Sequence, residues 1–152
     1  MTFSERRSSG NAPRFAAAPG EQSGKGPRPL RVLVVDDHRD TVLSLIMLLS
    51  EEGYEVHSAY SSRRVMDALT DFDPDVVVLD IHLPERSGWE VAWTIRYWRG
   101  KERPMLIGVS GLYREGADRV LSQLVGFNHY LMKPYAPADL LALIASVRNA
   151  AH

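Results

Sequence analysis

The stretch DPDVVVLDIHLP, residues 73–84, contains an apolar run that ends in a carboxylate. Residues 76–79 are three valines and a leucine, and Asp80 comes directly after them. An unbroken apolar run of this length between two prolines is typical of a central parallel strand that is covered on both faces. A carboxylate beside such a strand is unfavourable to bury unless a partner compensates its charge. Asp80 is therefore either a loop residue that reaches water or a residue whose charge is compensated.

Short apolar runs alternate with longer helical patterns from Leu30 onward. Five strand-then-helix units in succession predict an α/β fold: a doubly wound, five-stranded parallel sheet with helices on both faces. The strands are expected at residues 30–36, 54–59, 75–80, 104–110 and 129–133. The helices are expected near residues 39–52, 61–70, 87–99, 114–125 and 136–149. An apolar stripe on the fourth helix comprises Ala117, Val120, Leu121, Leu124 and Val125.

The composition is that of a soluble globular chain with room for one hydrophobic core. The chain has 152 residues, of which 45% are hydrophobic and 24% are charged. It has no cysteine, which excludes disulfides, thiolate metal ligands and cysteine nucleophiles. The longest apolar stretch, residues 42–49, is far shorter than the roughly 20 residues of a membrane helix. We therefore expect a cytoplasmic protein that does not enter a membrane.

Residues 1–28 differ from the rest of the chain in charge and composition. Five basic residues against two acidic ones give this segment a charge of +3, which leaves −4 for residues 29–152 of a chain whose total is −1. The segment is rich in Ser, Gly, Pro and Ala and has no apolar periodicity, so it cannot bury enough surface to offset its ordering entropy. We expect a disordered basic tail at residues 1–28 and one folded domain at residues 29–152.

Polar residues stand at the ends of the predicted strands. Asp36 and Asp37 end the first strand, Asp80 the third and Ser110 the fourth, and Lys133 ends the fifth. Each alone is typical of a turn, a helix cap or a solvated loop. In an open parallel sheet, however, the carboxyl ends of the strands form one edge, and ligands bind there. Three carboxylates at one edge repel one another, so we expect Lys133 and a hard divalent ion, Mg²⁺, to compensate them.

This combination of groups suits phosphoryl transfer. A bound Mg²⁺ beside an ammonium and a hydroxyl can receive a phosphoryl group, whose transition state needs positioning and charge neutralisation. A carboxylate can act as the nucleophile in such a site and form an aspartyl phosphate.

Four motifs in this order, VLVVDD, VVVLDIHLP, GVSG and YLMKP, resemble the receiver domain of two-component response regulators. The resemblance covers roughly residues 30–149 and is to the stand-alone, chemotaxis-regulator-like type. It implies the strand order 2-1-3-4-5 and a Lys-Pro peptide bond that is commonly cis. It also implies that a sensor histidine kinase or a histidine phosphotransfer protein donates a phosphoryl group to this domain.

The resemblance assigns a role to each acidic residue at the edge of the sheet. Asp80 is the implied phosphoacceptor. Mg²⁺ is implied on Asp36, Asp37 and Asp80, with the backbone carbonyl of His82 as a further ligand.

A conformational switch is implied for the other residues of these motifs. Ser110 is expected to bind a phosphoryl oxygen and Lys133 to pair with the phosphoryl group. Tyr130 resembles the aromatic residue that turns inward when the serine moves, although an ordinary half-buried strand aromatic is the alternative. Gly111 is small, as access of a phosphoryl donor requires.

Two residues depart from the pattern of this family. His82 follows the acceptor by two positions, and Arg86 stands where the family often has methionine. Both positions shape access to the site. The resemblance therefore does not specify how long the phosphoryl group would stay on Asp80. His38 and His82 also suggest a transition-metal site. This alternative is weaker, because no third fixed nitrogen or sulfur ligand is apparent in the sequence.

The helix at residues 39–52 has more apolar residues than one core-facing stripe needs. The residues that best fit a contact with the sheet are Leu45, Leu48 and Leu49. The residues left for a partner are Leu43, Ile46 and Met47. In response regulators this helix commonly docks the helical bundle of a histidine kinase or phosphotransfer protein, and we expect the same use here.

Three aromatic residues, Trp93, Tyr97 and Trp98, lie close together on the helix at residues 87–99. A patch for self-association or for a partner is one interpretation. Packing of these residues beneath the N-terminal segment is the other, and the sequence leaves both open.

We therefore expect a signalling switch that changes its protein contacts, and not an enzyme with a substrate of its own. Too few residues follow the last helix for an effector domain, so no DNA-binding domain is expected, and the downstream target stays open. The alternative is a Mg²⁺-dependent phosphatase or phosphotransferase acting on small molecules, which needs a substrate pocket that this chain has no long insertion to cap. A flavodoxin-like cofactor binder is disfavoured because three carboxylates repel a flavin phosphate.

Overall fold

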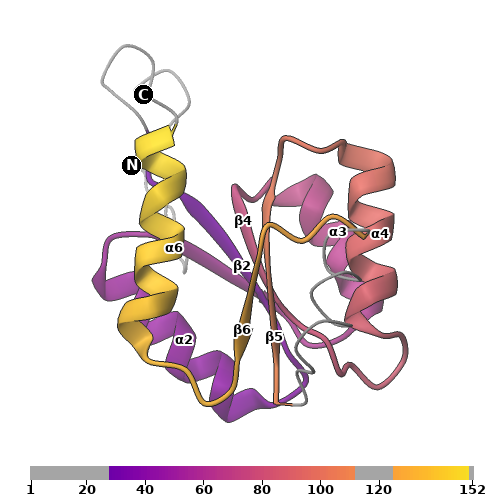
Figure 1. Cartoon of the computed structure of the whole chain (residues 1–152), viewed down its shortest axis with the longest axis horizontal. Coiled ribbons are helices and arrows are strands. Elements are labelled where there is room, and N and C mark those ends of the chain that lie inside the picture. Colours follow the sequence, from indigo (N-terminus) through magenta and orange to yellow (C-terminus); the bar gives the residue numbers. More distant parts are fainter. Residues whose placement is uncertain (1–27, 112–124, 151–152) are drawn as a thin grey trace, which may run out of the picture.

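The computed structural model describes residues 28–111 and 125–150, and these residues form a five-stranded parallel sheet with helices on both faces (Figure 1). The strands are β2 (Arg31–Val35), β3 (Glu55–Ala59), β4 (Val76–Asp80), β5 (Met105–Ser110) and β6 (His129–Met132). Their order in the sheet is β3-β2-β4-β5-β6. Numbered along the chain, this is the predicted order 2-1-3-4-5, so the predicted fold class is confirmed.

Four helices lie in the described part of the chain. They are α2 (Arg39–Glu51), α3 (Ser62–Asp71), α4 (Gly88–Arg99) and α6 (Pro137–Ala150). Each begins and ends within one or two residues of its predicted position. The helix predicted at residues 114–125, with its apolar stripe, falls almost entirely outside the described residues. None of the helices in the described residues has the length and apolar character to cross a membrane.

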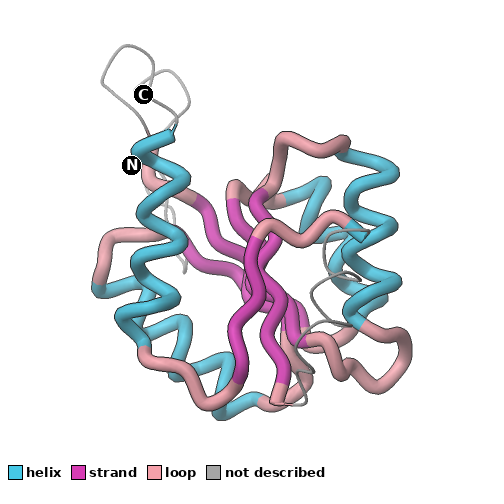
Figure 2. The backbone as a smooth tube through the Cα atoms, in the orientation of Figure 1, coloured by secondary structure: helices cyan, strands magenta, loops and turns pink. Residues whose placement is uncertain are grey.

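The helices cover the sheet in two pairs, α2 with α6 on one face and α3 with α4 on the other (Figures 1 and 2). All five residues of β4 are buried. Its side chains alternate between the two layers: Val76 and Val78 join the core under α2 and α6, whereas Val77 and Leu79 join the core under α3 and α4. The unbroken apolar run is explained by these two covered faces, and it fixes where Asp80 emerges.

Gly88 allows α4 to begin directly against the end of β4. Its N–H donates a hydrogen bond to the Ile81 carbonyl at 2.7 Å. A Cβ atom at this position would lie 2.6 Å from Ile81 Cα and 2.7 Å from the Asp80 carbonyl oxygen, which is closer than atoms can pack. Ser87 and Glu90 form a capping box at the same helix end. The loop after Asp80 is therefore held between the strand and a capped helix.

Asp75 joins three segments at the amino edge of the sheet. Its carboxylate accepts hydrogen bonds from the guanidinium groups of Arg28 at 2.9 Å and Arg103 at 2.7 Å, and from the backbone N–H of Arg31 at 2.9 Å. Burial raises the pKa of Asp75, but the hydrogen bonds and the positive charges of these arginines outweigh it, so the pKa is lowered. This carboxylate is fully compensated, in contrast with the one at the opposite edge.

Candidate functional site

The polar residues that the sequence places at strand ends lie along the carboxyl edge of the sheet. Asp36 follows β2, Asp80 ends β4, Ser110 ends β5 and Lys133 follows β6. Asp36, Asp80 and Ser110 are buried, with 4%, 5% and 1% of their surfaces exposed. The ammonium of Lys133 lies 3.5 Å from Asp36 Oδ2. The peptide bond between Lys133 and Pro134 is cis, as the family resemblance implies.

Asp36, Asp37 and His38 form a close group of metal-ligating atoms that lie within 4.8 Å of one another. His38 Nδ1 is 3.4 Å from an oxygen of each carboxylate, and the backbone N–H of His38 donates to Asp36 Oδ1 at 2.9 Å. Two of the residues predicted to hold Mg²⁺ are thus side by side. Within the described residues this group contains His38, one of the two histidines of the weaker transition-metal interpretation, but neither Asp80 nor His82.

Asp80 carries a charge that its surroundings compensate only in part. Burial raises the pKa of its carboxyl, and the negative charges of Asp36 and Asp37 raise it further. The backbone N–H of His82, 3.1 Å from Asp80 Oδ1, and the charge of Lys133 oppose this shift but do not cancel it. A buried carboxylate in this state is stabilised by any added cation. In the folded chain, the negative charge of Asp80 is therefore not fully compensated, as the sequence predicts.

The side chain of His82 makes a contact that the sequence did not predict. Its Nε2 lies 3.0 Å from Ser110 Oγ, within hydrogen-bond distance. Both residues belong to the sequence motifs. The direction of the His82 side chain, however, depends on the neighbouring strand, which the motifs do not specify. β4 and β5 pair in parallel with Asp80 beside Val109, and this register brings the residue after Val109 next to the loop that contains His82.

Tyr130, the predicted switch aromatic, is half-buried against the first turn of α4. Its ring centre lies 5.9 Å from that of Trp89, with 23° between the ring planes. Trp89 also makes an edge contact with Phe127 at 5.5 Å. These rings belong to the core layer under α3 and α4. A change in the position of Tyr130 would therefore alter the packing of Trp89.

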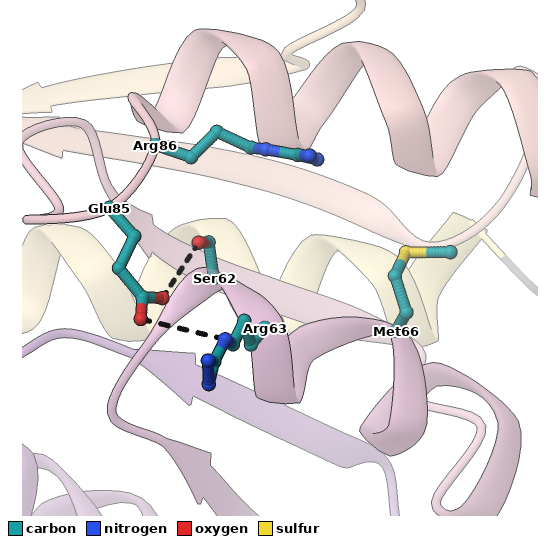
Figure 3. A pocket seen from close by; sticks show the side chains of 5 residues that line it. All are labelled: Ser62, Arg63, Met66, Glu85 and Arg86. Atoms are coloured by element: carbon teal, nitrogen blue, oxygen red, sulfur yellow. Dashed lines mark hydrogen bonds and ion pairs between the residues drawn. The ribbon is translucent and has the colours of Figure 1, made fainter.

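A cavity of about 490 Å³ lies beside the loop that follows β4, between this loop and α3 (Figure 3). Its lining residues are Ser62, Arg63, Met66, Glu85 and Arg86. Glu85 accepts a hydrogen bond from Ser62 Oγ at 3.2 Å and lies 3.8 Å from Arg63 Nε. Arg86, one of the departures from the family pattern, lines this cavity on the side of the loop.

The face of α2 predicted for a partner is partly exposed. Leu43 and Met47 have 53% and 65% of their surfaces exposed, whereas Ile46 is half-buried against the core. The buried residues of this helix are Val42, Leu45 and Leu49, and Leu48 is half-buried. Two of the three residues predicted for docking are thus open to contact from outside.

The aromatic residues of α4 form an exposed patch on the opposite face of the molecule. Trp93 stacks on Tyr97 with their ring centres 5.5 Å apart, and Tyr97 meets Trp98 edge to face at the same distance. The alternative in which this patch packs beneath the N-terminal segment involves residues outside the described part of the chain.

Comparison with known proteins gives one family and many similar structures. The model of the response regulator receiver domain family matches residues 32–145. A CheY-like response regulator receiver domain protein from Methanospirillum hungatei JF-1 is 30% identical, with 78% of this chain and 92% of that chain covered and a TM-score of 0.71. A signal receiver domain of a response regulator from Bermanella marisrubri is 27% identical, with 77% and 96% covered and a TM-score of 0.69.

A further similar structure supports the fold alone because its identity is lower. It is the chemotaxis response regulator CheY4 of Vibrio cholerae, which is 24% identical over 78% of this chain and 98% of that chain, with a TM-score of 0.71. Residues 32–145, which the family model matches, contain four of the strands completely and all of β2 except Arg31, and so include Asp36, Asp80, Ser110 and Lys133.

Proposed function

The chain belongs to the response regulator receiver domain family, and on that premise we propose that it is a phosphoacceptor protein of a two-component system. In this proposal a histidine kinase or a histidine phosphotransfer protein transfers a phosphoryl group to Asp80 in the cytoplasm. The single observation that carries the proposal is the buried Asp80, whose pKa is raised by burial and by the charges of Asp36 and Asp37. A buried carboxylate with a raised pKa is more typical of a functional site, as a ligand or a nucleophile, than of a structural position.

The donor atoms at the edge of the sheet fit Mg²⁺. Carboxylate oxygens from Asp36, Asp37 and Asp80 and the backbone carbonyl of His82 would hold the ion. These are hard oxygen donors, which Mg²⁺ prefers, and they carry more negative charge than Lys133 neutralises. When bound, Mg²⁺ supplies positive charge for the oxygens of the phosphoryl group that is transferred.

The residues of this chain have separate tasks in the transfer. Asp80 Oδ1 accepts the N–H of His82, and among the described residues Oδ2 has no hydrogen-bond partner, so we assign the attack to Oδ2. The new P–O bond forms at this oxygen while the P–N bond of the donor phosphohistidine breaks. The departing imidazole nitrogen keeps the electron pair of that bond and takes up a proton. Lys133 and the hydroxyl of Ser110 then bind phosphoryl oxygens.

The changed contact between Ser110 and its surroundings is the output of the reaction. The added phosphoryl group brings new charge and strong acceptor oxygens beside β5, and it can draw Ser110 toward Asp80. Tyr130 follows, and the surface above its ring changes. We further propose that the donor docks on α2 through Leu43, Ile46 and Met47, because the exposed Leu43 and Met47 and the half-buried Ile46 give this helix an apolar surface that suits a helical bundle.

The alternative of a small-molecule phosphatase would need a substrate cavity beside these carboxylates. The cavity lined by Asp36 and Asp80 has a volume of about 10 Å³. This is room for about one water molecule and not for an organic substrate.

The proposal is tested by phosphorylation without a kinase. The protein is incubated with acetyl phosphate and Mg²⁺, and its intact mass is measured. One phosphoryl group per chain is expected, and it should be stable in acid and labile in base. The variant Asp80→Ala and a sample with the metal chelated should both remain unmodified. No adduct on the unaltered chain, or an adduct retained by Asp80→Ala, would overturn the proposal.

A further inference from the structure

His82 is connected to both the phosphoacceptor and the switch serine. Its backbone N–H donates to Asp80 Oδ1 at 3.1 Å, and its ring nitrogen Nε2 lies 3.0 Å from Ser110 Oγ. The residue as a whole is exposed, whereas Asp80 and Ser110 are buried. Its imidazole therefore contacts the buried Ser110, and its backbone contacts the buried Asp80.

The contact restricts what the serine hydroxyl can do. A serine hydroxyl has one proton to donate, and Nε2 of a neutral imidazole is either an acceptor or a donor. If Nε2 accepts, the only proton of Ser110 Oγ is shared with His82. If Nε2 donates, Oγ is still tied to the ring by an accepted hydrogen bond. In both cases the contact with His82 competes with a move of Oγ toward a new partner on Asp80.

We propose that His82 is a positioning residue that holds the Ser110 hydroxyl in the unphosphorylated arrangement and thereby opposes the switch. The inference rests on the proposed function of Asp80 and concerns the regulation of the same site. In this proposal the side chain of His82 acts through Ser110. The backbone of His82 contributes to the site independently, because its N–H and carbonyl remain in every substitution.

The expected size of the effect follows from the strength of a neutral hydrogen bond. Such a bond changes an equilibrium by roughly two- to tenfold when it is removed without leaving a buried group unsatisfied. His82→Ala removes the side-chain contact between residue 82 and Ser110 Oγ. The variant should therefore bind beryllofluoride, a phosphoryl analogue, about fivefold more tightly than the unaltered chain in the presence of Mg²⁺. Fluorine NMR of the bound analogue measures this affinity.

Two further variants separate the contact from simple crowding of the site. In the conservative variant His82→Gln, a side-chain amide can reach Ser110 Oγ, so the affinity should return to within about twofold of the unaltered chain. In a Ser110→Ala background, His82→Ala should leave the affinity of that background unchanged, because the contact is already absent. If His82→Ala tightens binding by the same factor in the unaltered chain and in the Ser110→Ala background, the ring only blocks access to the site. That result would overturn the proposal.

A second readout uses the protein without metal or analogue. Nitrogen NMR of the imidazole reports the hydrogen bonding of Nε2 directly. Ser110→Ala should shift the Nε2 resonance of His82, whereas Ser58→Ala, a substitution of a half-buried serine on β3, should not shift it. If the chemical shift of His82 Nε2 is the same in Ser110→Ala as in the unaltered chain, the contact on which the proposal is built is contradicted.

Failure of this proposal and failure of the proposed function give different results. If the unaltered chain does not bind beryllofluoride with Mg²⁺, the role of Asp80 is wrong and the inference falls with it. If the unaltered chain binds the analogue and His82→Ala binds it with the same affinity, Asp80 keeps its role and the role of His82 is wrong.

Discussion

The ammonium of Lys133 lies 3.5 Å from Asp36 Oδ2, at the ends of β6 and β2, which are not neighbours in the sheet. Asp36 is almost fully buried, and the side chain of Lys133 is about two-thirds buried. The contact therefore crosses the edge of the sheet in front of β4, where Asp80 emerges. It brings the positive charge of the site to the carboxylates before any phosphoryl group is present.

Lys133→Met should destabilise the domain by about 1–2 kcal/mol in the absence of Mg²⁺, because it leaves the buried Asp36 without its cation. Mg²⁺ should restore a large part of this loss, since it supplies charge to the same carboxylates. Urea denaturation with and without Mg²⁺ measures both effects. Lys101→Met, at an exposed lysine in the loop after α4, is the matched control and should change neither curve.

The raised pKa of Asp80 predicts how stability depends on pH. The carboxyl binds a proton more tightly in the folded chain than in the unfolded chain. Between its ordinary pKa and the raised one, the folded state holds more protons, so the contribution of Asp80 to stability falls as pH rises through this range. Above the raised pKa the contribution stays at its lower value. Asp80→Asn should therefore raise the melting temperature at neutral pH and flatten this part of the pH profile.

Mg²⁺ distinguishes this effect from a general change in charge. The unaltered chain should melt at a higher temperature with Mg²⁺, by an amount that corresponds to about 2.7 kcal/mol at one hundred times the dissociation constant. Asp80→Asn should respond less, because one of the proposed ligands has lost its charge. A melting temperature that does not change with Mg²⁺ would contradict the role of Asp80 as a metal ligand.

Gly88→Ala should destabilise the domain by about 2–4 kcal/mol. The added Cβ would collide with backbone atoms of Ile81 and Asp80, which cannot give way without moving the end of β4. Gly111→Ala is the control, because a Cβ there would meet no atom of the described residues within 4 Å and the glycine has no positive φ angle. Thermal denaturation of the two variants should show a large loss for the first and almost none for the second.

Charge on the exposed face of α2 should separate the donor proteins from small donors. The double substitution Leu43→Glu and Met47→Glu should slow transfer from the cognate kinase about tenfold, because it removes two apolar contacts from the proposed interface. Phosphorylation by acetyl phosphate should keep its rate. Trp98→Lys, at an exposed apolar residue on the opposite face, tests whether any surface charge has this effect. Equal loss with both donors would rule out a docking role for α2.

Much of the fold follows from local patterns in the sequence. The run at β4 is apolar at every position because α2 and α6 cover one of its faces and α3 and α4 the other. Pro137 and Gly53 mark the start of α6 and the end of α2, as their backbone preferences require. The alternation of strands and helices leaves few topologies open, and the positions of the polar strand ends follow from the parallel arrangement.

The contacts that the sequence did not reveal depend on side chains from distant segments. Asp75 is held by Arg28 and Arg103, which only the folded chain brings together. His82 reaches Ser110 because of the register between β4 and β5, and Tyr130 meets Trp89 because α4 begins so close to β4. Short motifs specify which residues line the site, but not which of them share a hydrogen bond.

The central claim is that Asp80 carries the phosphoryl group, and chemical trapping tests it most directly. The chain is treated with acetyl phosphate and Mg²⁺ and then with borohydride, which reduces an aspartyl phosphate to homoserine. Peptide mass spectrometry then locates the reduced residue. We predict homoserine at position 80 and unmodified aspartates at positions 36 and 37. Homoserine at position 36 or 37, or at no position while the chain still gains a phosphoryl group, would contradict the account.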